Sequence, residues 1–97
     1  MSDAFEIASE RDGDELRLLV RGELDIATAP RLAAAMPDEQ APSVLLDLSG
    51  VSFMDSTGLR AVLALHDEIG ERLRIVASEP AMRLFVLVGA DARLPLQ

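Results

Sequence analysis

The 97-residue sequence predicts a single-domain α/β fold, in which a mixed sheet of four to five strands opens with an antiparallel hairpin and carries three to four helices. Strand-like segments flank an Asp-Gly turn near the N-terminus, and a nearly continuous apolar run follows at residues 43–48. Apolar residues then recur with helical spacing after residue 56. A chain of this length holds one modest core, so we expect one domain over residues 1–97.

The hairpin is expected from residues 4–9 and 15–20, because Asp12-Gly13 between them is a strong signal for a tight turn. In the second strand, apolar residues alternate with polar or mixed ones. The apolar set predicts the buried face and consists of Leu16, Leu18 and Val20. This strand is expected to end within residues 22–25.

A short first helix is expected next, with Thr28 at the N-cap position before Pro30 and an end near Met36. The apolar run at residues 43–48 suits a central strand that is covered on both faces. Asp47 is the polar exception in that run, and we interpret it as a structural residue that accepts backbone hydrogen bonds at the strand end.

The second helix is expected over residues 57–69, with Gly70 as its C-terminal cap. At 100° per residue, one arc of this helix predicts the core face: Leu59, Val62, Leu63, His66 and Ile69. The opposite side is less polar than a solvated face requires and could receive a partner; it carries Ala61, Ala64 and Leu65.

Residues 73–77 predict another strand, and a strand on each side of one helix implies a right-handed parallel crossover. A last helix is expected from Ser78 and Pro80 to Val88, where Gly89 closes it. An edge strand is expected near residues 93–96.

Composition excludes several classes of function. The formal net charge of −8 disfavours direct nucleic acid binding, because phosphates would be repelled. The absence of cysteine and the single His disfavour thiolate chemistry and a metal site. No signal peptide or membrane-spanning run is recognised, so we expect a cytoplasmic protein with no membrane contact. We expect no cofactor and no enzyme activity, since phosphate-binding glycine loops are absent.

Residues 51–59 are the most informative stretch, because an apolar lead-in meets a helix start at Asp55 and Ser56. Either side chain could cap the first N–H groups of the helix. The same positive field would hold a phosphate placed on Ser56, which would add about 1.5 to 2 negative charges. We interpret the elbow as a surface charge switch.

Three motifs carry a family resemblance: Gly-Glu-Leu-Asp at residues 22–25, Leu-Leu-Asp-Leu-Ser at 45–49 and Phe-Met-Asp-Ser-Thr-Gly-Leu at 53–59. In this order they closely resemble the STAS domain of bacterial anti-sigma factor antagonists, and the match covers nearly the whole chain. The resemblance implies that Ser56 is phosphorylated by an anti-sigma factor that is also an ATP-dependent serine kinase. It implies that the unmodified protein binds this kinase and releases a sigma factor, and that a serine phosphatase restores the unmodified form.

The resemblance also implies a partner surface around the elbow. We expect the chain to be a monomer or a weak dimer. The residues expected to contact the partner are Asp25, Asp55, Ser56, Thr57, Gly58, Arg60 and Ala61. The last helix departs from the family pattern, because residues 82–88 are unusually apolar, and this predicts an exposed apolar patch.

Other interpretations stay open beside this one. Ser56 or Asp55 could serve only as a helix cap, and Asp25 only as a turn residue before Thr28. A nucleophilic pair of Ser56 with His66 is disfavoured, because ten helical residues separate them by about 15 Å, and a buried, hydrogen-bonded His66 is expected instead. The chain could also be a STAS scaffold subunit, or a partner-switch regulator of a process other than transcription.

Overall fold

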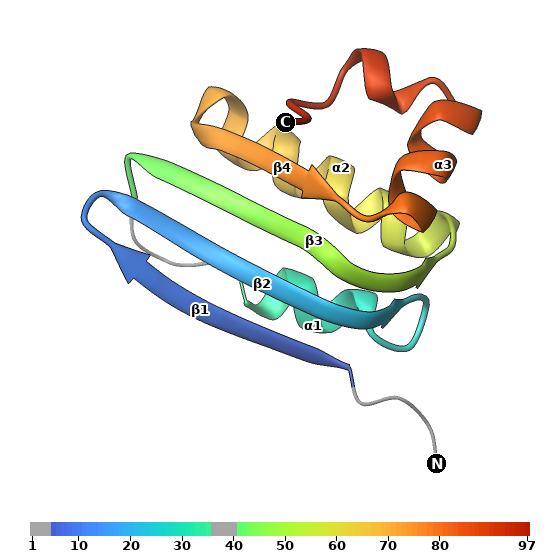
Figure 1. Cartoon of the computed structure of the whole chain (residues 1–97), viewed down its shortest axis with the longest axis horizontal. Coiled ribbons are helices and arrows are strands. Elements are labelled where there is room, and N and C mark those ends of the chain that lie inside the picture. Colours follow the sequence, from blue (N-terminus) through green and yellow to red (C-terminus); the bar gives the residue numbers. More distant parts are fainter. Residues whose placement is uncertain (1–4, 36–40) are drawn as a thin grey trace.

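The computed structural model describes residues 5–35 and 41–97. Figure 1 shows their arrangement. The elements are β1 (Glu6–Asp12), β2 (Glu15–Leu24), α1 (Ala29–Ala34), β3 (Ser43–Met54), α2 (Ser56–Ile69), the 3-10 turn η1 (Gly70–Arg72), β4 (Leu73–Ala77), α3 (Glu79–Leu87) and the 3-10 turn η2 (Ala90–Ala92).

The four strands form one mixed sheet in the order β1-β2-β3-β4, with β1 antiparallel to β2 and the other pairs parallel. This confirms the predicted mixed sheet and its N-terminal hairpin. The hairpin pairs Asp12 with Glu15, and Gly13 has a φ of 62° in the turn between them. Glycine adopts that left-handed conformation without steric cost, which explains the Asp-Gly signal.

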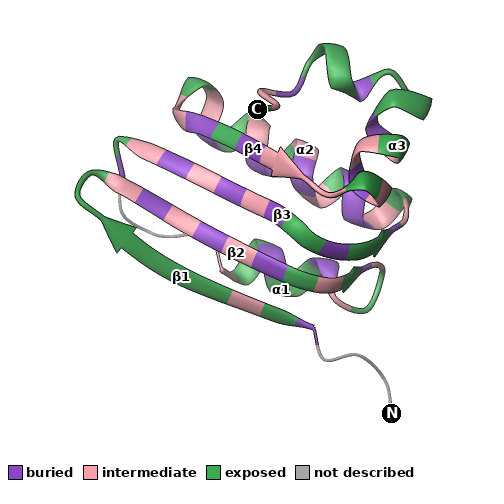
Figure 2. Ribbon diagram, viewed as in Figure 1, coloured by how far each residue is buried: buried purple, intermediate pink, exposed green. Residues whose placement is uncertain are grey.

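The helices α1 and α2 lie behind the sheet in Figure 1, whereas α3 lies beside β4 and the end of β3. Leu18, Leu46 and Ile75 are neighbours across three strands and are fully buried on the helix side. Figure 2 shows the resulting alternation of buried and half-buried residues along β2 and β3. Each such side chain contributes about 1.5 to 3 kcal/mol of transfer free energy, so this layer is the centre of the core.

The strands β1 and β3 are longer than the sequence predicts. β1 reaches Asp12, beyond its predicted end, while its predicted start at residue 4 lies outside the described residues. β2 ends at Leu24, within residues 22–25 as predicted. β3 continues through Gly50 to Met54, because its last residues pair with the end of β2 as far as Leu24. Register shifts between the two strands accommodate this extension. Both strands therefore end at the same edge of the sheet.

The first helix begins as expected, with Thr28 at the N-cap position, but it ends at Ala34; the predicted end at Met36 lies outside the described residues. The predicted core face of α2 is wrong at one side. Leu65 is buried with 4% exposure, whereas Leu63 is only half-buried. The reason is that α1 packs against α2, so the side of the helix that bears Leu65 is covered as well.

The C-terminal segment forms a single parallel bridge between Ile75 and Leu96 instead of the predicted edge strand. Its backbone bonds run from Ile75 N–H to Pro95 O at 3.0 Å and from Gln97 N–H to Ile75 O at 2.8 Å. Pro95 has no N–H to extend a ladder, which limits the pairing. The bridge still occupies part of the β4 edge.

The last helix begins as predicted, because the Ser78 hydroxyl accepts a hydrogen bond from Ala81 N–H at 3.3 Å. Its end carries the predicted exposed apolar patch, formed by Val86, Leu87 and Val88. Within the described residues, none of the helices has the length and apolar character needed to cross a membrane.

Candidate functional site

The elbow between β3 and α2 is held by Asp55. Its Oδ1 atom accepts hydrogen bonds from Thr57 N–H at 2.9 Å and Gly58 N–H at 3.0 Å. Its carbonyl oxygen accepts a further bond from Leu59 N–H at 2.9 Å. Of the two residues that the sequence offers as caps, the structure therefore assigns the N-cap to Asp55 and makes Ser56 the first residue of the helix.

Ser56 is exposed, and in the described part of the chain its hydroxyl makes no hydrogen bond. The hydroxyl is thus accessible without any change in the fold. Because Asp55 already holds the N–H groups of Thr57 and Gly58, a phosphoryl group on Ser56 would not gain those two donors. The field of the helix dipole would still favour it, and the exposed Arg60 is its neighbour one turn later on the same face of α2.

Gly58 fixes the position of the elbow relative to β2. A Cβ atom on Gly58 would lie 2.3 Å from the carbonyl oxygen of Leu24. The same oxygen accepts a hydrogen bond from Asp55 N–H at 3.3 Å, so the first turn of α2 sits directly against the end of β2. Only glycine leaves room for this approach. The sequence predicts that Gly58 belongs to the start of the helix, and the reason that a glycine stands there is steric.

Asp25 organises the loop that follows β2. Its Oδ1 accepts hydrogen bonds from Ala27 N–H at 3.0 Å and Thr28 N–H at 3.2 Å. The Thr28 hydroxyl donates to Glu23 O at 2.7 Å, so it closes the loop and does not cap α1. The geometry gives Asp25 the turn function that its alternative interpretation predicts. Since Leu24 meets Asp55, this loop and the elbow lie together at one edge of the sheet.

The remaining predicted contact residues follow Ser56 along α2. Thr57 and Ala61 are half-buried, and Arg60 is exposed. Arg60 makes no ion pair within residues 5–35 and 41–97.

The model of one protein family, described as Mlab, STAS domain, matches residues 7–96. The chain belongs to the STAS domain family. Two proteins named anti-sigma-B factor antagonist, from Listeria monocytogenes and Listeria innocua, are each 36% identical to this STAS domain over 87 residues. The matches cover 82% of the chain and 76% of each relative.

Solved structures agree with the fold of the STAS domain. A crystal structure of an anti-sigma factor antagonist from Mycobacterium paratuberculosis superposes with a TM-score of 0.84 and 30% identity, covering 99% of this chain and 89% of that chain. The unphosphorylated form of the anti-sigma factor antagonist SpoIIAA has a TM-score of 0.68 and 21% identity. It covers 97% of this chain and 87% of that chain, and at this identity it supports the fold alone.

Two exposed apolar side chains at the same edge of the STAS domain were not predicted from the sequence. Ile26, in the loop after β2, is 73% exposed, and Phe53, near the end of β3, is 47% exposed. Phe53 pairs with Glu23 across the sheet and lies three residues before Ser56. Exposed apolar side chains mark a protein-binding surface where they gather in one patch, and both of these lie at the end of the sheet that bears the elbow. The sequence offers one indication that Phe53 is exposed: neighbouring side chains of a strand point to opposite faces, and the next residue, Met54, is buried.

Two other polar residues of the STAS domain serve the fold. Asp47 accepts a hydrogen bond from Ser49 N–H at 2.9 Å, as its structural interpretation predicts, but it lies within β3 and not at a strand end. The expectation of a hydrogen-bonded, buried His66 is wrong, because its side chain is half-buried and its buried Nδ1 has no partner in the described part of the structure. Among those residues, no group of three or more His, Asp or Glu side chains could hold a metal ion.

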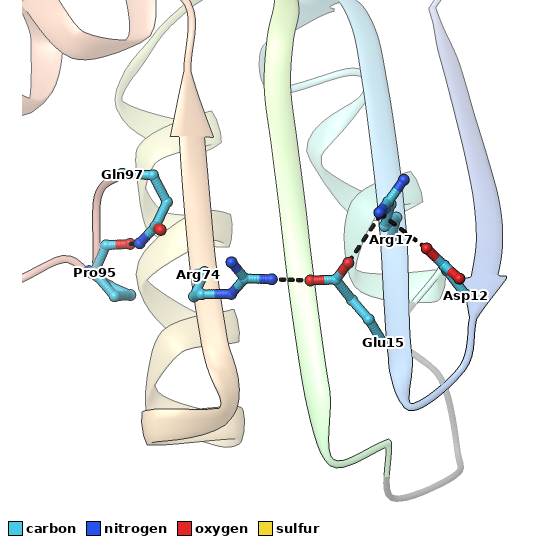
Figure 3. Close-up of polar contacts among 6 residues, drawn as sticks. All are labelled: Asp12, Glu15, Arg17, Arg74, Pro95 and Gln97. Atoms are coloured by element: carbon cyan, nitrogen blue, oxygen red, sulfur yellow. Dashed lines mark hydrogen bonds and ion pairs between the residues drawn. The ribbon is translucent and has the colours of Figure 1, made fainter.

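The opposite end of the sheet is occupied by paired charges. Figure 3 shows Arg74 of β4 reaching across β3 to Glu15 of β2, and Arg17 placed between Glu15 and Asp12. Arg17 Nε lies 2.9 Å from Glu15 Oε1, and Arg17 Nη2 lies 3.2 Å from Asp12 Oδ2. These charges neutralise one another, whereas Ser56 and Arg60 at the elbow have no such partners within the described ranges.

Proposed function

We propose that this STAS domain is an anti-sigma factor antagonist whose binding is switched by phosphorylation of Ser56. The observation that carries the proposal is the exposed Ser56 hydroxyl, which makes no hydrogen bond in the described residues and is held at a rigid helix start. The Listeria relatives named anti-sigma-B factor antagonist support the class of function.

In the proposed cycle, the unmodified chain binds an anti-sigma factor that is also a serine kinase, and the sigma factor is released. The kinase then transfers the γ-phosphoryl group of ATP to Ser56: the Oγ–P bond forms, the bond from phosphorus to the ADP oxygen breaks, and the hydroxyl proton passes to a base on the kinase. The phosphorylated chain dissociates, and a serine phosphatase hydrolyses the phosphoester. This chain is the phosphoryl acceptor and catalyses no step.

Electrostatic repulsion is large enough to drive the release. If one charge of the phosphate lies about 4 Å from an acidic group at the interface, the repulsion is on the order of 4 kcal/mol at an effective dielectric of about 20. That energy weakens binding by hundreds-fold. The N–H groups of Thr57 and Gly58 are already bonded to Asp55, so the phosphate gains no hydrogen bond from these two cap donors.

The proposed partner surface is centred on the elbow. It comprises Asp25, Asp55, Ser56, Thr57, Gly58, Arg60 and Ala61. The exposed Ile26 and Phe53 at the same edge supply apolar area, which contributes more to protein association than exposed charges do. Asp25 and Asp55 each use Oδ1 to accept backbone hydrogen bonds, and the second carboxylate oxygen of each can still contact the partner.

The test is incubation with candidate anti-sigma factor kinases and ATP, followed by location of the phosphoryl group by mass spectrometry. We expect phosphate on Ser56 only, and we expect Ser56→Ala to bind the kinase without being phosphorylated. Ser52→Ala is the matched control, because Ser52 is also exposed and lies four residues earlier on β3. Phosphate on another residue of the wild-type protein would refute the proposal.

One observation favours a second function, that of a scaffold subunit in a larger signalling complex. The apolar end of α3 is exposed, with Leu87 at 79%, Val86 at 56% and Val88 at 53%. Light scattering separates the two functions. A monomer or weak dimer supports the switched antagonist, whereas large particles support the scaffold.

A further inference from the structure

We infer that a groove between α1 and α2 receives an apolar side chain of the anti-sigma factor kinase while that kinase contacts Ser56. The inference rests on the proposed function and identifies the chemistry of one part of the partner. The residues lining the groove are Leu32, Ala33, Ala61, Ala64, Leu65 and Glu68.

The groove exists because the facing positions carry very small side chains. Leu32 and Leu65 are buried and pack between the helices, whereas Ala33 and Ala64 are exposed. Methyl groups at these positions leave a hollow of about 260 Å³ between α1 and α2. Among the residues that the structure describes, its lining is apolar apart from the exposed Glu68.

The size of the groove favours a protein side chain as its occupant. Small-molecule sites are usually concave spaces of about 300 to 1,000 Å³ with several convergent polar groups. This groove lies below that range and offers the single carboxylate of Glu68. A pocket that takes one aromatic or aliphatic anchor is, in contrast, a common feature at the centre of protein interfaces.

The position of the groove places it within reach of the same partner. Ala61 and Ala64 follow Ser56 by five and eight residues on α2, which corresponds to about 7.5 and 12 Å along the helix axis. A standard interface buries roughly 800 Å² on each partner, so one centred near Ser56 extends over this distance. At 100° per residue, Ala64 lies about 80° and Ala61 about 140° around the helix from Ser56, so the groove opens on the side of α2 next to the one that bears Ser56.

Charge indicates what surrounds the anchor on the partner. Glu68 is exposed at the groove, and the chain has a formal net charge of −8. A basic residue next to the apolar anchor would pair with Glu68, and a basic surface would be attracted to the whole molecule. The occupant we assign is an aliphatic or aromatic side chain flanked by Lys or Arg.

The experiment compares Ala33→Leu with Ala34→Leu. Ala33 lines the groove, whereas its neighbour Ala34 is equally exposed on α1 and does not line it. Leucine is a good helix former, so both variants should fold, and denaturant unfolding checks that they do. The dissociation constant for the kinase is measured by calorimetry without ATP, so that Ser56 stays unmodified.

We expect Ala33→Leu to weaken kinase binding at least tenfold, because the added side chain fills the groove, and Ala34→Leu to stay within twofold of wild type. Ala64→Leu, which fills the groove from α2, should repeat the loss. If the wild type binds and is phosphorylated on Ser56 while both groove variants bind as tightly as Ala34→Leu, the inference is overturned and the proposed function stands. If the wild type binds no such kinase, both are overturned.

Discussion

The two ends of the sheet use their charged side chains in different ways. Where β2 begins, Glu15 pairs with Arg17 and Arg74 across the open face, so side chains satisfy side chains. Where β2 and β3 end, Asp25 and Asp55 are bonded to backbone N–H groups of their own loops. Those bonds fix the backbone and leave Ser56 and Arg60 without partners in the described residues.

The difference shows which end of the sheet has polar groups that remain available for binding a partner. Partly exposed ion pairs contribute about 0 to 1 kcal/mol each to stability. Removing one of the charges at the paired end should therefore change the free energy of unfolding little. The elbow combines a hydrogen-bonded backbone with exposed apolar side chains at Ile26 and Phe53 and with a Ser56 hydroxyl that makes no bond within the described residues. A rigid site loses little conformational entropy on binding, which favours association at this end.

The largest expected effect on stability is at Gly58. Gly58→Ala should lower the free energy of unfolding by about 3 kcal/mol, because the new Cβ overlaps the Leu24 carbonyl oxygen at 2.3 Å. At most helix positions the same change would be stabilising by about 0.5 to 1 kcal/mol, so its sign is decisive. Urea unfolding measures both the sign and the size.

Gly13→Ala is the matched control at the other end of the sheet. A Cβ at Gly13 has open space around it, and the cost is limited to the φ of 62°, about 1 to 2 kcal/mol. If Gly58→Ala were neutral or stabilising, the close contact between α2 and β2 would be disproved.

A smaller effect is expected at the helix cap. Asp55→Ala should lower the free energy of unfolding by about 1 kcal/mol, within a range of 0.5 to 2, because Thr57 and Gly58 lose their acceptor. Asp55→Asn keeps an acceptor oxygen and should retain most of the stability. Asp67→Ala, at an exposed position of the same helix, should stay within about 0.5 kcal/mol of wild type. Equal losses at Asp55 and Asp67 would contradict the assignment of the cap.

The smallest effect is expected at the paired end of the sheet. Glu15→Gln removes the carboxylate that faces Arg17 and Arg74, yet it should cost less than about 1 kcal/mol. The difference from wild type should shrink further in 1 M salt, which screens exposed charges. Kinase binding should stay within twofold, and a larger loss would place this end of the sheet in the interface.

Local features of the site could be predicted from the sequence, and contacts between distant segments could not. The helix start at residues 55–58 is visible as a polar elbow after an apolar strand, and the structure confirms a cap there. The steric need for Gly58 depends on Leu24, which the fold brings to the elbow from another strand. A periodicity of 3.6 residues carries no information about such a contact.

The same reasoning explains the error at α2. Helical spacing gives the direction of one core face, but Leu65 is buried because α1 covers a second side of the helix. The groove between the two helices follows from that packing and from the alanines at Ala33 and Ala64. The sequence indicated only that the outer face of α2 was weakly polar.

The most direct test of the central claim compares kinase binding by the unmodified chain and by the chain phosphorylated on Ser56, with the unfolding curve of each form measured in parallel. The account predicts a dissociation constant raised by hundreds-fold on phosphorylation, together with nearly equal stability, because Asp55 holds the helix start in both forms. Equal affinity of the two forms would contradict it. So would a loss of affinity accompanied by unfolding of the domain.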